Sequence, residues 1–190
     1  MKDIYLASSS PRRRQILKDL GLNFTVSPPV DFKEKLSEAE PEVLVSDNAL
    51  GKAMEVAGNH KDSVIIGCDT IVMFGNEIFG KPLTPDNAYM MLKKLSGNCH
   101  SVLSGLAVID TQIYKELVGY ERAEVKFKEL SEKEINDYVK SGEPLDKAGA
   151  YGIQECGGVF VENVKGNFST VVGLPEELLK KFLSIVTLKS

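Results

Sequence analysis

The chain has 190 residues, a formal net charge of -4 and 43% hydrophobic residues, which suits one globular domain with a sizeable core. The acidic balance argues against a nucleic-acid binder, which normally presents a basic face. No apolar run approaches the ~20 residues of a membrane span, and polar Ser8–Arg14 comes too early to allow a signal peptide. Three cysteines without C-x-x-C spacing fit a cytoplasmic location and exclude a zinc knuckle.

The N-terminal segment predicts a short strand, Ile4–Ala7, followed at once by a helix. Ser10 is a good N-cap, Pro11 suits the first helical position, and Gly21 ends the helix. The first turn carries arginines, which oppose the helix macrodipole: Arg12, Arg13 and Arg14. A bound anion would make the serine hydroxyls, free N–H groups and guanidinium groups favourable together. The alternative is a solvated basic helix start.

The stretch Val64–Met73 predicts a strand buried on both faces, with Asp69 in its middle. A lone carboxylate in an apolar strand costs several kcal/mol unless a cation or hydrogen-bond donors compensate. An Arg, a Lys, a metal or a metal with phosphate should therefore meet Asp69. Alternatively, Asp69 is a structural residue that caps a loop where the strand breaks at Gly67.

Two lysines are candidates to meet Asp69. The segment Pro41–Ala57 predicts a helix on which Lys52 lies at the edge of the buried side. A lysine there usually extends to solvent, but it could instead reach a buried anion. The turn former Gly75–Asn76 predicts a hairpin in which Thr70 and Asp69 would face Lys81 and Pro82, bringing a second lysine to the same carboxylate.

The remaining chain alternates between predicted helices and strands. Helices are expected from Pro85 to about Leu95, from Ser131 to Gly142 and from Pro175 onward, strands over Cys99–Ile109 and Tyr114–Phe127, and a hairpin of Val159–Val164 with Phe168–Val172. His100 is expected to make structural hydrogen bonds. The glycines of Asp146–Gln154 would let backbone approach a ligand, with Tyr151 stacking and Gln154 reading a base edge. This order predicts an α/β fold with a long twisted mixed sheet, two lobes and a central cleft.

Five motifs share their order and spacing with one known family. They are Ser8–Arg13, Gly67–Thr70 with Gly80–Pro82, Leu95–Gly97 with His100, Asp146–Gln154 and Val172–Pro175. Together they resemble the Maf family of nucleoside triphosphate pyrophosphatases, which were first linked to septum formation. The resemblance implies a single Maf-like domain of two lobes over residues 1–190, with an inosine-triphosphatase-like fold.

The resemblance also implies a substrate class. The loop Ala150–Gln154 is similar to that of the dTTP/UTP branch, whereas the 7-methyl-GTP branch has a glutamine where this chain has Thr70. In the dTTP/UTP branch, Asp69 would be the proton acceptor. Base specificity would be set by Arg12, Thr70 and Gln154.

The expected reaction cleaves between the α- and β-phosphates and releases a nucleoside monophosphate and pyrophosphate. A divalent cation (Mg²⁺, Mn²⁺ or Co²⁺) is expected, held by Asp69 and Glu34 with the substrate phosphates. We favour Asp69 orienting a metal-bound water over Asp69 acting alone, because a free aspartate is a weak base at neutral pH. The triphosphate would be neutralised and bound by Arg12, Arg13, Lys52, Lys81, Ser8 and Ser10.

The chain departs from the family pattern at several positions. Lys33 stands where a second acid is common beside Glu34, Ser46–Asn48 replaces a more apolar, often Arg-bearing stretch, Cys68 replaces alanine, and Asn167 replaces Ser or Asp. The Lys33 change could weaken metal binding. Two alternatives stay open: a pyrophosphatase for 7-methyl-GTP or another non-canonical nucleotide, and a nucleotide-sensing regulator of cell division with little turnover. A nucleotide is the expected partner, with no nucleic acid or membrane, and a homodimer is left open.

Overall fold

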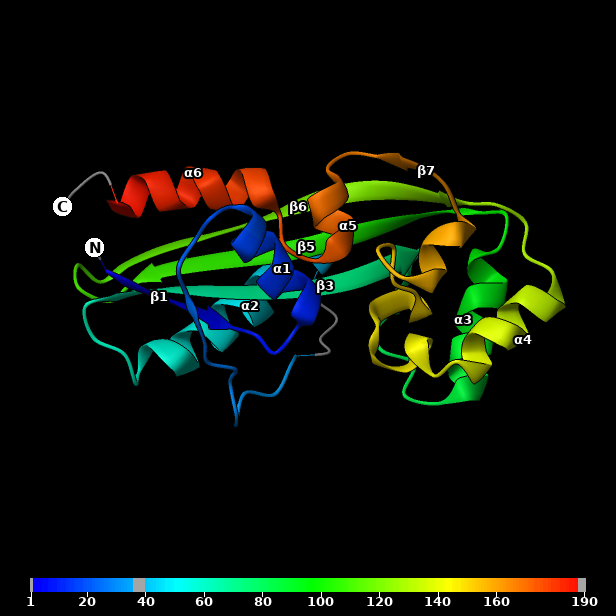
Figure 1. Cartoon of the computed structure of the whole chain (residues 1–190), viewed down its shortest axis with the longest axis horizontal. Helices are drawn as coiled ribbons and strands as arrows, with labels where there is room; N and C mark the ends of the chain where they lie inside the picture. The colour runs from blue at the N-terminus through cyan, green and yellow to red at the C-terminus, as the bar shows by residue number, and fades with distance from the viewer. Residues whose placement is uncertain (1, 36–39, 188–190) are drawn as a thin grey trace. The chain divides into compact units, whose positions relative to one another are not determined.

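The structure, a computed structural model, describes residues 2–35 and 40–187 (Figure 1). The strands are β1 (Asp3–Ala7), β2 (Thr25–Val26), β3 (Ser63–Phe74), β4 (Glu77–Phe79), β5 (Cys99–Asp110), β6 (Lys115–Phe127) and β7 (Val161–Lys165). The α-helices are α1 (Pro11–Asp19), α2 (Pro41–Ala57), α3 (Pro85–Leu95), α4 (Glu132–Lys140), α5 (Phe168–Val172) and α6 (Glu176–Thr187). Short 3₁₀ helices are η1 (Glu143–Asp146), η2 (Ala148–Ala150) and η3 (Cys156–Phe160).

The described strands form one mixed sheet in the order β2-β1-β3-β5-β6-β7, with β4 paired to β3. Strand β1 runs parallel to both β2 and β3, whereas β4 is antiparallel to β3 and β7 is antiparallel to β6. The chain divides into two compact units. The first comprises Met1–Asp69, Ser104–Glu121 and Gly173–Ser190, and the second comprises Thr70–Leu103 and Arg122–Val172.

In the first unit, helix α2 packs closely on β3 and β5 because each strand carries a glycine where the helix crosses. A Cβ atom at Gly67 would lie 2.3 Å from the carbonyl oxygen of Ala49, and one at Gly105 would lie 2.1 Å from that of Val45. Any side chain at either position would push the helix away from the sheet. The small side chain of Ala53 completes this contact, at 2.8 Å from the Gly67 Cβ position.

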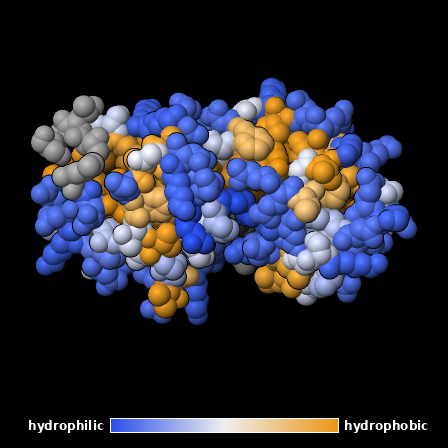
Figure 2. Space-filling model, in the orientation of Figure 1, coloured by the Kyte–Doolittle hydropathy of each residue, from blue (hydrophilic) through white to orange (hydrophobic). Residues whose placement is uncertain are grey.

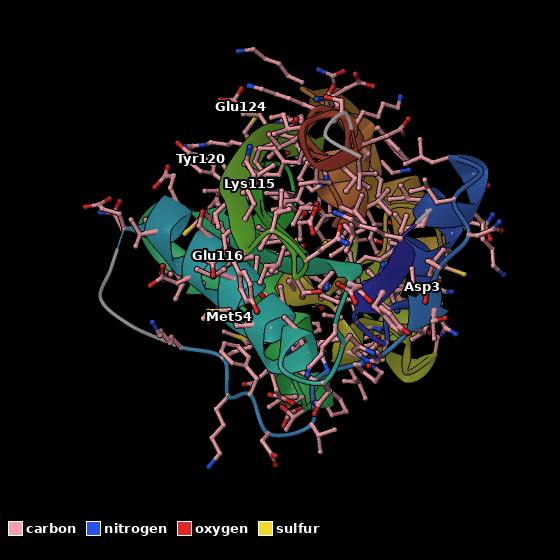
Figure 3. The ribbon with its side chains drawn as sticks, turned by 90° about the vertical axis from the view of Figure 1, so that its left-hand side faces the viewer. Asp3, Met54, Lys115, Glu116, Tyr120 and Glu124 are labelled. Carbon is pink, nitrogen blue, oxygen red and sulfur yellow. The ribbon has the colours of Figure 1, made fainter. Side chains whose placement is uncertain are left out.

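Some large side chains of the first unit are exposed at its surface. Met54 of α2 is 51% exposed and Tyr120 of β6 is 46% exposed, and Figure 3 shows both at the surface together with Glu116. Figure 2 shows hydrophilic side chains over most of the visible face, with smaller hydrophobic patches among them. None of the described helices combines the length and apolar character that crossing a membrane requires.

In the second unit, aromatic rings form the centre of the core. The His100 Nε2 atom lies 2.8 Å from the Tyr151 hydroxyl, and the Phe127 ring makes edge contacts with both rings. Burial lowers the pKa of His100 to about 4, so its ring is neutral at pH 7. The structural role expected for His100 is confirmed. Tyr151 is only 6% exposed, so the expectation that it stacks on a ligand is wrong, because its ring fills this core.

Helix boundaries agree well with the sequence patterns. The predicted caps Ser10 and Ser131 accept backbone N–H bonds at the starts of α1 and α4, and α2 spans Pro41–Ala57 as expected. The predicted hairpin of Val159–Val164 with Phe168–Val172 is wrong. Phe168–Val172 is helix α5, and β7 pairs with β6 instead.

We expect Gly67→Ala to lower the free energy of unfolding by about 1–3 kcal/mol, because the added methyl group overpacks the contact between β3 and α2. Gly80→Ala is the matched control, since a Cβ atom there would meet nothing within 4 Å. Urea denaturation of both variants checks this. A Gly67→Ala variant as stable as Gly80→Ala would show that α2 does not need this close approach.

Candidate active site

Asp69 is a buried carboxylate on β3, and its cationic partner is Lys52 of α2. Asp69 is 4% exposed, and the Lys52 Nζ atom lies 2.6 Å from its Oδ1 atom. Because side chains alternate along a strand, Asp69 projects from the same face as Gly67, onto which α2 packs. Of the two possibilities that the sequence left open for Lys52, this ion pair shows the inward one, in which the lysine reaches a buried anion.

A second carboxylate, Glu34, meets the same ammonium group. The Lys52 Nζ atom lies 2.6 Å from Glu34 Oε1. The loop that carries Glu34 is fixed on α2 by Glu55, whose Oε1 atom accepts the N–H groups of Val30 at 2.5 Å and Asp31 at 3.1 Å. These backbone hydrogen bonds lower the pKa of the Glu55 carboxyl. Glu34 is thus held near Asp69 by a docked loop rather than by a regular element.

Asn48 is part of this group, although the sequence patterns named it only as a departure from the family. Its side-chain Nδ2 atom donates a hydrogen bond of 3.1 Å to Asp69 Oδ2. Asn48 lies one helical turn before Lys52 and is 2% exposed, so both side chains reach Asp69 from one face of α2. A polar residue at a buried helical position is the signal that could have revealed it.

The serine- and arginine-rich start of α1 is tied to the backbone beside Asp69. Arg13 Nη1 donates to the Ser8 Oγ atom at 3.1 Å and to the carbonyl oxygen of Cys68 at 3.0 Å, and Arg13 Nε donates to the carbonyl oxygen of Gly173 at 2.8 Å. These bonds use Arg13 to hold the helix start in place. Binding of a phosphate by Arg13 stays a prediction.

The other predicted site residues differ in how far they are exposed to solvent. Ser10 is the N-cap of α1, and Arg12 is half-buried in its first turn. Thr70 is half-buried directly after Asp69, and Gln154 is exposed between η2 and η3.

Lys81 does not follow the register that the sequence suggested. Met73 does pair with Ile78 as expected, but the antiparallel ladder ends at the pair Val72–Phe79. The extension that would have set Lys81 and Pro82 opposite Thr70 and Asp69 is therefore not formed, and Lys81 is exposed. The expectation from the register was wrong because β4 ends two residues before Lys81. A role for Lys81 with substrate stays a prediction.

Two carboxylates, not three, converge at this site. Within residues 2–35 and 40–187, no group of three or more His, Cys, Asp or Glu side chains is arranged to hold a metal ion. Asp69 and Glu34 each direct an oxygen toward the point that the Lys52 ammonium occupies. Oxygen ligands of this kind fit a hard divalent cation that takes its other ligands from water and phosphate.

The sequence matches the family described as Maf-like protein over residues 3–186. The chain belongs to the Maf-like protein family. Among its relatives, the dTTP/UTP pyrophosphatase of Aquifex aeolicus is 48% identical over 180 residues, covering 95% of this chain and 93% of that protein. The dTTP/UTP pyrophosphatase of Dictyoglomus thermophilum is 44% identical over 184 residues, covering 96% of this chain and 95% of that one. The dTTP/UTP pyrophosphatase of Clostridioides difficile is 44% identical over 188 residues, covering 96% of this chain and 96% of that one.

Solved structures identify the fold of this Maf-like protein. The HAM1 protein from Coxiella burnetii superposes with a TM-score of 0.55 at 16% identity, covering 97% of this chain and 100% of that chain. The Ham1 protein of Staphylococcus aureus gives a TM-score of 0.51 at 16% identity, covering 96% and 98%. The predicted inosine-triphosphatase-like α/β fold is confirmed.

We expect Lys52→Met to lower the free energy of unfolding by about 3–5 kcal/mol, because it leaves the buried Asp69 carboxylate without a cation. The double variant Lys52→Met/Asp69→Asn should regain much of this loss, since it also removes the buried charge. Lys133→Met is the control: its partner Asp137 is exposed, so little change is expected. Equal losses in the single and double variants would contradict a coupled pair. Thermal and urea unfolding measure all three.

Proposed function

We propose that this Maf-like protein is a nucleoside triphosphate pyrophosphatase that converts dTTP and UTP to the monophosphate and pyrophosphate. The observation that carries the proposal is its similarity, over nearly the whole chain, to relatives with that name. Five of these relatives are 42–48% identical and each alignment covers at least 92% of this chain. The buried group of Asp69, Lys52 and Glu34 supports the same chemistry.

Hydrolysis of a phosphoanhydride requires positioning and charge neutralisation more than covalent chemistry. Asp69 is suited to orient the attacking water or to accept its proton, because the carboxylate is itself held in place. Lys52 bonds its Oδ1 atom and Asn48 bonds its Oδ2 atom. A carboxylate held at both oxygens keeps one orientation, so it loses little freedom when the water approaches. Lys52 supplies positive charge at the same point.

The remaining roles come from the family resemblance. Lys81, Arg12 and Arg13 are proposed to neutralise the triphosphate, while Ser8 and Ser10 hydrogen-bond its oxygens. Ser10 and Arg12 lie at the N-terminal end of α1, where the helix dipole favours an anion.

A divalent cation, Mg²⁺, Mn²⁺ or Co²⁺, is the cofactor we propose. Asp69 and Glu34 are the residues that would hold it, because their carboxylates already converge on one cation, the Lys52 ammonium. When bound, such an ion supplies charge neutralisation for phosphate oxygens. Lys33 extends beside Glu34 as an exposed residue, so it adds no carboxylate to this pair.

Base selection is proposed to rest on Arg12, Thr70 and Gln154. Gln154 carries both a donor and an acceptor in its amide group and is exposed, so it can match the edge of a pyrimidine base. Thr70 fits the dTTP/UTP branch by resemblance. We further propose one Maf-like domain over residues 1–190 and a cytoplasmic location, which the three free cysteines support.

We expect Asp69→Asn to lower kcat for dTTP by about 100-fold or more, because it removes the group that orients or deprotonates water. Asp110→Asn is a matched control: Asp110 is also a buried, lysine-paired aspartate, with Lys2 Nζ at 2.6 Å, and its loss should leave kcat nearly unchanged. Pyrophosphate release from a panel of nucleotides, with and without Mn²⁺, measures both. Near-normal turnover by folded Asp69→Asn would remove Asp69 from the mechanism, and turnover of 7-methyl-GTP alone would reject the proposed substrates.

We expect Gln154→Ala to blur discrimination among bases while basal turnover stays measurable, because the donor and acceptor that read the base are lost. The ratio of kcat/KM for UTP to that for CTP and GTP is the quantity to compare. Gln112→Ala is the control, since Gln112 is an exposed glutamine in the turn between β5 and β6. An unchanged UTP preference in Gln154→Ala would refute its role.

A further inference from the structure

Asn48 contacts both the Asp69 carboxylate and the backbone of the loop that carries Glu34. Its Oδ1 atom accepts the N–H of Lys35 at 2.9 Å, and its Nδ2 atom donates to the carbonyl oxygen of Lys35 at 3.3 Å. The same Nδ2 atom donates to Asp69 Oδ2 at 3.1 Å. One buried amide group therefore joins the backbone directly after Glu34 to the carboxylate on β3.

The rest of this loop lies along the same face of α2. The Phe32 ring packs over Gly51, where a Cβ atom would lie 2.1 Å from the ring. Glu55 holds the start of the loop through two backbone N–H groups. Positions 48, 51, 52 and 55 are three or four residues apart, so they line one side of the helix. Among the described hydrogen bonds, Asn48 and Lys52 both touch Asp69 as well as this loop. Lys52 meets the Glu34 side chain, whereas Asn48 bonds the loop backbone at Lys35.

We propose that Asn48 is a positioning residue, which fixes the orientation of Asp69 and the place of Glu34 relative to it. The proposal rests on the proposed function, because it assigns Asn48 to the same reaction. A side chain that only anchored the loop would need no bond to Asp69. A side chain that only completed the ion pair would need no bond to Lys35, and Asn48 makes both.

Two substitutions separate these contributions. Asn48→Leu keeps the branched shape and the number of side-chain heavy atoms but removes every hydrogen bond, so Asp69 Oδ2 and the Lys35 N–H lose this partner. Asn48→Asp keeps an acceptor for the Lys35 N–H but replaces the donor to Asp69 with a second carboxylate, which repels it. The bond from the Lys35 N–H is therefore kept in Asn48→Asp, while the bonds to the Lys35 carbonyl oxygen and to Asp69 are lost.

The experiment combines backbone hydrogen exchange, measured without substrate, with steady-state hydrolysis of dTTP. In Asn48→Leu, exchange of the Lys35 amide should be at least about 10-fold faster, and kcat should fall by about 10- to 100-fold, as for groups that orient a catalytic ligand. In Asn48→Asp, the Lys35 amide should stay protected while kcat falls as far, with KM changed less than about threefold. Asp47→Asn is the control. Asp47 touches the same loop through Lys35 Nζ at 3.2 Å, is partly exposed, and should change neither quantity.

Normal kcat in Asn48→Asp would overturn the proposal, because it would show that the bond to Asp69 has no effect on the reaction. Unchanged exchange at Lys35 in Asn48→Leu would overturn it as well, since the loop would not depend on Asn48. The proposed function fails separately, if the unmodified protein hydrolyses no nucleoside triphosphate. In that case the exchange measurement still decides whether Asn48 holds the loop, and the assignment to catalysis is rejected.

Discussion

The ion pair between Asp69 and Lys52 is the interaction on which the candidate site depends. A carboxylate inside an apolar strand is costly unless a cation lies within direct contact, and the two atoms here are 2.6 Å apart. Such contact requires the helix that carries Lys52 to lie almost on the strand. Gly67 and Gly105 allow this approach by having no side chain under α2. The close packing of α2 on β3 therefore brings Lys52 within reach of Asp69, so the packing and the ion pair depend on the same glycines.

Helix α2 combines two functions along its length. Its alanines pack in the core of the first unit, with Ala49 and Ala53 both fully buried. Its polar face holds Asp69 through Asn48 and Lys52 and holds a loop through Glu55. Because one rigid element makes all of these contacts, it holds Asp69 and the loop of Glu34 beside each other.

Local sequence rules predicted the helices and strands better than they predicted the tertiary contacts between them. Capping residues such as Ser10 and Ser131 determine helix starts through their own hydrogen bonds, so they can be recognised without the fold. Phe168–Val172 was misjudged because its β-branched residues favour a strand, whereas tertiary packing buries Thr170 and Val172 in a short helix. Lys52 was found because a buried charge demands a partner. Asn48 was missed because a buried amide demands a partner less strongly than a buried charge does, so its position on the buried side of the helix is a weaker signal.

Charge within the site bears on the proposed substrate and cofactor, because it favours a metal–nucleotide complex over a free nucleotide. Asp69 and Glu34 contribute two negative charges around the single positive charge of Lys52, so this group has a formal charge of -1. A bare triphosphate would meet repulsion from this group. A divalent cation carried by the triphosphate would instead be attracted to the two carboxylates, and Lys52 could then share its charge with phosphate oxygens. The net negative charge of this group thus favours the form of substrate that the proposed reaction needs.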